Sequence, residues 1–153
     1  MAARSRYAEI VKILLDSGAE IDKEDYLNMT PLSYAASWGG QYDVAKMLIN
    51  RGADINKKDC FRTTPLHIAA TALTAGYHNV VQLLLERGVK PNERNGNGET
   101  PLHYAAHNNR YEMVKYLLSW GADTYVKDNL GHTALQMAII HIWIRSQQGG
   151  SLW

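Results

Sequence analysis

Four copies of one short phrase, spaced about 33 residues apart, constrain this chain more than any other feature. In its fullest form the phrase is Thr-Pro-Leu-His-x-Ala-Ala, and its copies begin at Thr30, Thr64, Thr100 and Thr133. The fourth copy is weaker, because it has lost the proline and the histidine. Repetition at this period indicates a stacked solenoid, whose units cannot bury their apolar faces alone.

A second phrase keeps step with the first. It pairs apolar residues with a glycine three residues later, and the glycines are Gly18, Gly52, Gly88 and Gly121. The glycines are 34, 36 and 33 residues apart, and the threonines repeat the same three spacings. Two unlike signals that share one irregular spacing are hard to obtain by chance. The chain is therefore one domain made of modules.

Each part of the unit has a physical role in a helix pair. A threonine caps a first helix, and proline follows at the first helical position, where its missing N–H costs nothing. The Ala-Ala pair lets a neighbouring helix come close. A second run has apolar residues at helical spacing, and the glycine that follows suits the left-handed conformation that ends a helix.

These motifs resemble the ankyrin repeat, a β-turn and two antiparallel helices with a Thr-Pro-Leu-His-x-Ala motif. The resemblance covers roughly residues 7 to 145. It implies an all-α solenoid of stacked helix-turn-helix repeats joined by β-turn or hairpin loops. We expect a single domain over 1–153. Its parts are a partial repeat at 1–24, repeats at about 25–58, 59–94 and 95–127, a terminal partial repeat at 128–145, and a tail at 146–153.

Composition limits the partners and the compartment. The chain has 16 basic and 15 acidic residues and a net charge of +1, so we expect no nucleic-acid partner. No apolar run approaches the roughly 18 residues needed to span a bilayer, and the first residues lack the apolar core of a signal peptide. Cys60 stands alone, so no intramolecular disulfide is possible. We predict an intracellular protein, cytoplasmic or nuclear, without a membrane partner.

The sequence favours no chemistry. No nucleophile elbow, P-loop or dinucleotide fingerprint occurs, so we predict that the chain is not an enzyme. We assign structural roles to His67 and His103, the motif histidines. His103 and His107 are four residues apart and could face each other on a helix, a spacing compatible with zinc, but no Glu follows as in His-Glu-x-x-His and no Cys lies nearby in sequence. We expect no metal and no cofactor.

The resemblance implies a partner protein bound along a concave surface of turn tips and first helices. We expect Trp38 to matter most, since binding hot spots favour Trp, Tyr and Arg. The expected partner-binding residues are Tyr26, Leu27, Met29, Trp38, Phe61, Arg62, Leu73, Glu99, His107 and His132.

Two irregularities lie in the second unit. Arg62 stands where such turns usually hold glycine, so either its backbone is strained or the turn has changed shape. Phe61 beside it either contacts a partner or packs on a neighbouring turn. Three extra residues fall within residues 71–77, so we expect the first helix there to run one turn longer. The insertion, which contains Leu73, is either part of a binding face or tolerated loop drift.

Asn56 and Asn92 occupy a position that an asparaginyl hydroxylase can modify in ankyrin-like sequences. The alternative is that these side chains simply stabilise their turns.

The chain begins and ends inside a unit. The last helix carries apolar residues on several sides, among them Ile140, Trp143 and Ile144. In one interpretation the chain is part of a longer array, or a capping helix folds onto residues 146–153. In the other, these three residues form a patch for self-association or for a partner.

We therefore predict a non-catalytic scaffold or adaptor module that binds another protein. One alternative is the regulatory or substrate-recruiting segment of a larger enzyme. A small-molecule or nucleic-acid binder is a third class, which a basic concave stripe would favour.

Overall fold

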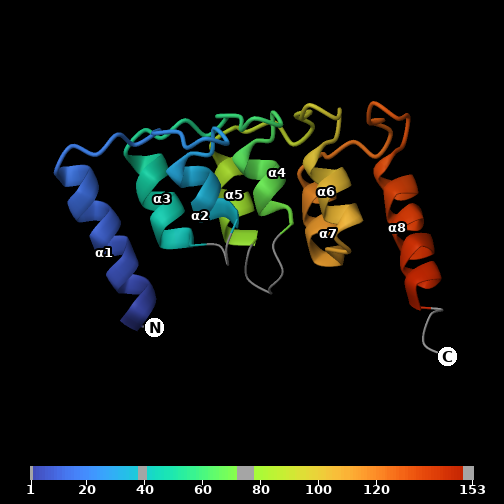
Figure 1. The fold of residues 1–153 in the computed structure, drawn as a ribbon, viewed down its shortest axis with the longest axis horizontal. Helices are drawn as coiled ribbons and strands as arrows, with labels where there is room; N and C mark the ends of the chain where they lie inside the picture. The colour runs from blue at the N-terminus through green and yellow to red at the C-terminus, as the bar shows by residue number, and fades with distance from the viewer. Residues whose placement is uncertain (1, 38–40, 72–77, 150–153) are drawn as a thin grey trace.

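The computed structural model describes residues 2–37, 41–71 and 78–149, which form eight α-helices and no strand (Figure 1). The helices are α1 (Ala2–Asp16), α2 (Pro31–Ser37), α3 (Tyr42–Asn50), α4 (Pro65–Ala69), α5 (His78–Glu86), α6 (Pro101–His107), α7 (Tyr111–Ser119) and α8 (Ala134–Gly149). In Figure 1 the helices lie side by side below one row of turns, with α1 and α8 at opposite ends of the stack. The predicted all-α solenoid is confirmed.

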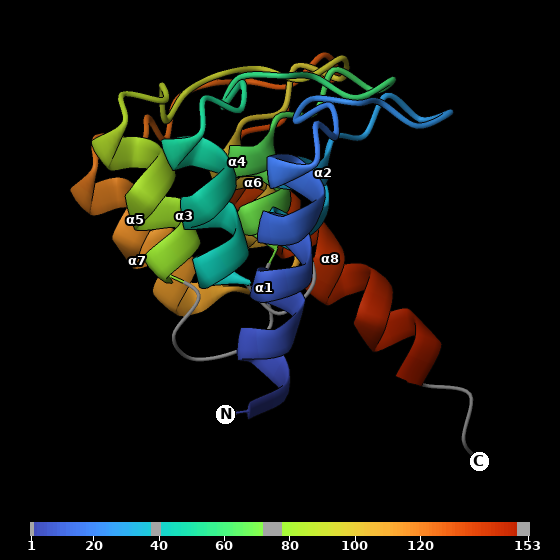
Figure 2. The same ribbon diagram turned by 90° about the vertical axis from the view of Figure 1, so that its left-hand side faces the viewer.

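The helices pack in pairs and in two rows. α2 packs against α3, α4 against α5, and α6 against α7, so three complete pairs form the middle of the stack. The first helices α2, α4, α6 and α8 pack on one another in sequence, and α1, α3 and α5 do the same. Figure 2 shows α2, α4, α6 and α8 on one side and α3, α5 and α7 on the other. None of the helices in the described residues is long and apolar enough to cross a membrane.

The repeated phrase begins each first helix and fills the core. Thr64 and Thr100 form capping boxes with the histidines three residues on, and a proline follows each threonine. The motif leucines Leu32, Leu66 and Leu102 are buried between the helices. Ala35, Ala69 and Ala105 are also buried, and these small side chains allow the close approach that the sequence predicted.

A glycine ends each second helix. At the end of α3, the N–H of Gly52 donates to Ile49 O, and the N–H of Ala53 donates to Leu48 O at 3.0 Å. This is the Schellman arrangement, and it requires the positive φ of 92° that Gly52 adopts. Gly18, Gly88 and Gly121 adopt similar angles, so the predicted role of the spaced glycines is confirmed.

The motif histidines join each unit to the next. The N–H of Thr64 donates to His67 Nδ1 at 3.3 Å, so Nδ1 is the acceptor and Nε2 carries the proton. Nε2 then donates to the carbonyl of Glu99, 3.0 Å away in the following turn. His103 makes the equivalent bonds to Thr100 and to the carbonyl of His132. Their predicted structural role is confirmed, and the ring of His107 instead contacts that of His141.

Two helix boundaries differ from the prediction. α4 ends at Ala69 instead of running a turn longer, because the Thr71 hydroxyl and N–H both donate to Ile68 O, at 2.8 and 3.1 Å. The inserted residues 72–77 lie outside the described residues. α8 continues to Gly149, into the segment expected to be a tail.

Candidate partner-binding surface

A single side chain in each unit builds the turn tip. Asp59 lies five residues before the motif threonine, and its Oδ1 accepts the N–H groups of Phe61 and Thr63, at 2.9 and 2.8 Å. The same two bonds recur around Asp25, Asn95 and Asp128. Our sequence reasoning missed these four residues. The signal was present, because Asp or Asn returns at this position with the spacing of the threonines.

Adjacent tips are joined by backbone hydrogen bonds. Cys60 N–H donates to Leu27 O at 2.9 Å, Gly96 N–H to Phe61 O at 2.9 Å, and Asn129 N–H to Asn97 O at 2.8 Å. At Gly96 the backbones come so close that a Cβ would lie 2.8 Å from Phe61 O. We call residues 25–29, 59–63, 95–99 and 128–132 the tip row. These bonds make it a preorganised surface.

Each tip has one residue in the left-handed conformation, two residues before the motif threonine. Asn28 and Arg62 both have φ of 60°, and Gly98 and Gly131 have φ of 75° and 86°. Arg62 keeps the bonds of a normal tip, so the turn has not changed shape. Arg62 therefore holds a backbone conformation that costs about 1 to 3 kcal/mol in a residue with a Cβ.

Large apolar side chains stand exposed on the tip row. Tyr26 is 89% exposed, Phe61 is 67% exposed, and Leu130 is also exposed. The Phe61 side chain therefore does not pack on a neighbouring turn, which was the alternative. Leu27 and Met29 are half-buried, and Arg62 is exposed. The tips of the first two units thus present most of the apolar surface.

Tyr34 extends this surface onto α2. Its hydroxyl donates to Asp25 Oδ2 at 2.5 Å, and the ring is partly exposed. This hydrogen bond lowers the pKa of Asp25 and raises the pKa of Tyr34. Tyr34 was not among the expected binding residues. It lies four residues after Thr30, on the first helix that the sequence predicted.

Three expected polar residues have structural partners. Glu99 is half-buried and its carboxylate accepts a hydrogen bond from Asn95 Nδ2 at 2.9 Å. His132 is half-buried, its N–H donates to Asp128 Oδ1 at 2.8 Å and its carbonyl accepts from His103 Nε2, whereas its buried Nδ1 has no hydrogen-bond partner among the described residues. His107 is exposed on α6, and its ring lies edge-to-face with the ring of His141 from α8, with 4.9 Å between the ring centroids. Burial, and then the charges of His107 and Arg145, lower the pKa of His141.

Trp38 and Leu73, two of the expected binding residues, lie outside the described residues.

The two asparagines predicted as possible hydroxylation sites, Asn56 and Asn92, differ in their surroundings. Asn92 donates to Gly121 O at 3.2 Å and accepts the N–H of Asp123 at 2.8 Å, so its side chain holds the next unit. Asn56 is exposed. Hydroxylation at either position stays a prediction.

No group of three or more His, Cys, Asp or Glu side chains in the described ranges could hold a metal ion. The one cysteine, Cys60, is free and exposed on the tip row.

The comparisons with known proteins agree with the repeat architecture. The profile of one protein family, described as Ankyrin repeats (3 copies), matches residues 1–59 and 66–146. A search among curated proteins found no match to the chain.

Proposed function

The chain belongs to the ankyrin repeat family, and on that premise we propose that it is a non-catalytic module that binds a partner protein along the tip row. Ankyrin repeats are generally protein–protein interaction modules. The partner would lie across the tips and the exposed side of the first helices, including Tyr34 on α2.

One observation carries the proposal: large apolar side chains stand exposed on turn tips that backbone hydrogen bonds join to one another. Tyr26 and Phe61 lie on neighbouring tips that Cys60 and Leu27 join by a backbone bond. Exposed apolar side chains in a cluster often mark interaction sites, and aromatic residues are common hot spots. A preorganised surface also loses little conformational entropy on binding. The partner segment should therefore offer apolar side chains to the first two tips.

The test compares two double variants of the full chain as affinity baits. Tyr26→Ala with Phe61→Ala removes the aromatic side chains of the tip row. Tyr111→Ala with Tyr125→Ala removes two exposed tyrosines from outside it and serves as the matched control. All four side chains are exposed, so both variants should keep the melting temperature of the unmodified chain within about 2 °C.

We expect proteins that bind directly to be lost with the first variant and retained with the second. For a purified partner, the first variant should lose about 2 kcal/mol or more of binding free energy, the range of hot-spot residues. Equal affinity of both variants would mean that the tip row is not the binding surface.

A further inference from the structure

We propose that this chain self-associates head to tail. In this arrangement α1 of one copy lies in a groove between α6, α7 and α8 of another copy. There it serves as the second helix of the unit that α8 begins. The proposal does not depend on the proposed function, because it uses the two ends of the stack and not the tip row.

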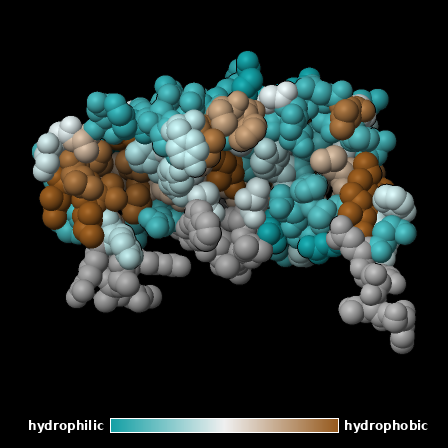
Figure 3. Space-filling view, in the orientation of Figure 1, coloured by the Kyte–Doolittle hydropathy of each residue, from teal (hydrophilic) through white to brown (hydrophobic). Residues whose placement is uncertain are grey.

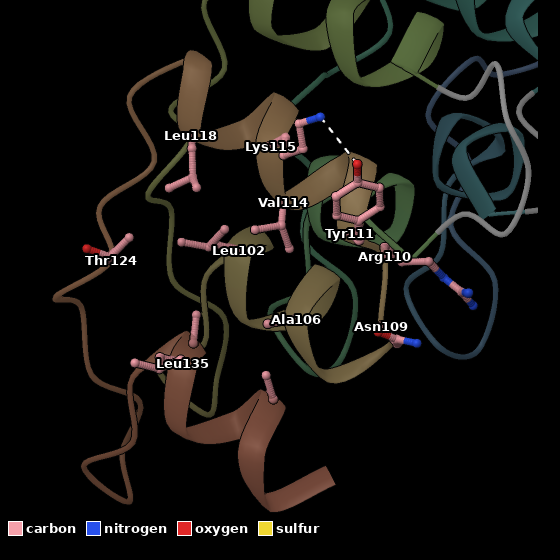
Figure 4. A pocket seen from close by; sticks show the side chains of 12 residues that line it. Leu102, Ala106, Asn109, Arg110, Tyr111, Val114, Lys115, Leu118, Thr124 and Leu135 are labelled. Carbon is pink, nitrogen blue, oxygen red and sulfur yellow. Dashed lines mark hydrogen bonds between the residues drawn. The ribbon is translucent and has the colours of Figure 1, made fainter. Parts of the chain in front are cut away.

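The groove is apolar and has a volume of about 550 Å³. α6 contributes Leu102 and Ala106, α7 contributes Val114 and Leu118, and α8 contributes Leu135. Figure 4 shows Leu102, Val114, Leu118 and Leu135 around one open space. It lies where a second helix would pack against α8, and none of the described helices occupies it.

α8 is exposed at the positions where the other first helices are buried. Leu135 is 69% exposed, whereas the equivalent leucines of the three complete pairs, Leu32, Leu66 and Leu102, are at most 2% exposed. Ile139 is exposed at the position of the buried Ala36 and Ala70. Ile142 continues the same helical face and is also exposed. By contrast, Ile140, one of the residues predicted for self-association, is half-buried.

α1 shows the complementary defect. Leu14 is 55% exposed, although Leu48, Leu84 and Leu117 at the same distance from the cap glycine are at most 1% exposed. Ile10 is also exposed, and its equivalents are buried. These are Val44, Val80 and Met113. In the complete pairs, these two positions of the second helix and the motif leucine of the first helix are all buried, and the two helices pack together. Among the described helices, α1 therefore resembles a second helix that no first helix covers, and α8 resembles a first helix that no second helix covers.

The surfaces of α7 and α1 that would face each other at the junction are also more exposed than the equivalent surfaces of α5. Val114 and Leu118 on α7 border the groove, but the equivalent Val81 and Leu85 on α5 are buried. Ile13 on α1 is exposed at the position of the buried Leu83. The opposite side of α1, with Val11 and Leu15, already packs against the core beside α3. Figure 3 shows the two apolar patches, one over α1 and one over α8.

Docking α1 in the groove would also extend the tip row. Within the chain, the donors Cys60, Gly96 and Asn129 bond to acceptors in the preceding tip. Tyr26 N–H holds the donor position of the first tip. Leu130 C=O holds the acceptor position of the last tip. A second copy would bring this donor and acceptor together, so the junction repeats the register of the stack.

One pair of like charges opposes the junction, and reversing one of the two charges provides a test of it. Inside the chain this register pairs Lys57 with Glu24 at 3.0 Å and Lys58 with Glu93 at 2.6 Å. At the junction the same register brings Lys127 of one copy beside Lys23 of the other. Lys23→Glu would replace this repulsion with an ion pair like those within the chain. Exposed pairs of this kind are worth up to about 1 kcal/mol, so association should tighten by up to about fivefold.

The experiment is sedimentation velocity of the 153-residue chain over a range of concentrations. In a head-to-tail complex, one copy still has a free α1 and another still has a free groove beside α8. The unmodified chain should therefore form species larger than a dimer as concentration rises. Ile10→Glu blocks the head and Leu135→Glu blocks the tail. Each variant alone should be monomeric, and an equal mixture should form dimers and nothing larger, because each supplies the end that the other lacks. Leu14→Glu and Ile139→Glu form a second pair in case a first variant misfolds.

Two controls separate this contact from others. Phe61→Glu places the same charge on an exposed apolar residue in the middle of the tip row and should leave association unchanged. Lys23→Glu should tighten association, and the gain should shrink as salt is added. A monomeric unmodified chain at millimolar concentration would overturn the proposal. Association that survives Ile10→Glu would also overturn the proposal. It would indicate a contact between two α8 helices, or a groove occupied by a segment other than α1.

Discussion

Replacing His67 with glutamine separates the two functions of the motif histidine. In the fourth unit, glutamine already stands at this position, and Gln136 Oε1 accepts the N–H of Thr133 at 2.8 Å. His67→Gln should therefore keep the cap of α4. The glutamine cannot also reach Glu99 O, which His67 Nε2 contacts in the next turn. The variant loses the link between units and keeps the helix start.

The size of the effect follows from what is lost. The bond to Glu99 O is worth about 1 kcal/mol net, and this carbonyl keeps a second donor, Asn95 N–H. The edge contact between the His67 and Tyr104 rings, at 5.4 Å, adds about 1 kcal/mol. We expect the free energy of unfolding to fall by about 2 kcal/mol at pH 8. His103→Gln is the matched variant and should cost about half as much, because Met137 takes the place of Tyr104.

The same variant should change the pH dependence of stability. Burial lowers the pKa of His67 from its ordinary 6.5, so the unfolded chain binds this proton more readily than the folded chain. The contribution of neutral His67 is complete above pH 6.5 and is lost as pH falls from 6.5 towards the folded-state pKa. The gap between the unmodified chain and His67→Gln should therefore narrow between about pH 8 and pH 5.5.

Urea unfolding at several pH values, followed by circular dichroism, measures both quantities. A loss below about 0.5 kcal/mol at pH 8 with an unchanged m-value would refute the proposed link between units. A gap that stays constant with pH would refute the argument that His67 is held neutral.

Three further predictions concern stability and use the same unfolding measurement. Arg62→Gly should raise the free energy of unfolding by about 1 kcal/mol, since glycine adopts φ of 60° without strain, whereas Arg62→Ala should not. Asp59→Ala should cost about 1 to 2 kcal/mol through the two lost turn bonds, and Asp59→Asn should be nearly neutral, because Asn95 builds the same turn. Leu66→Ala should cost about 2 to 5 kcal/mol and Leu135→Ala less than about 0.5, although both are motif leucines. Similar losses for the two leucines would contradict the assignment of α8 as a first helix with an open face.

Local chemistry made much of this fold predictable. Threonine and proline begin the first helices, and glycine ends the second helices through bonds within a few residues, so the period and the helix pairs could be derived from the sequence. The same holds for the left-handed residues of the turns. The Asp and Asn residues at the centre of each tip were equally regular, and they were missed only because their repetition was not compared with that of the threonines.

What depends on neighbours could not be derived in this way. The sequence left open whether Arg62 was strained or its turn reshaped, and the bonds around Asp59 decided that question. It also presented Leu66 and Leu135 as the same letter of one motif. Only the packing of a second helix against α4, and the open groove beside α8, made one residue core and the other surface. Burial of a side chain depends on the helix that packs against it. The sequence of a repeat therefore determines the shape of the repeat, but not what covers the exposed side of the last helix.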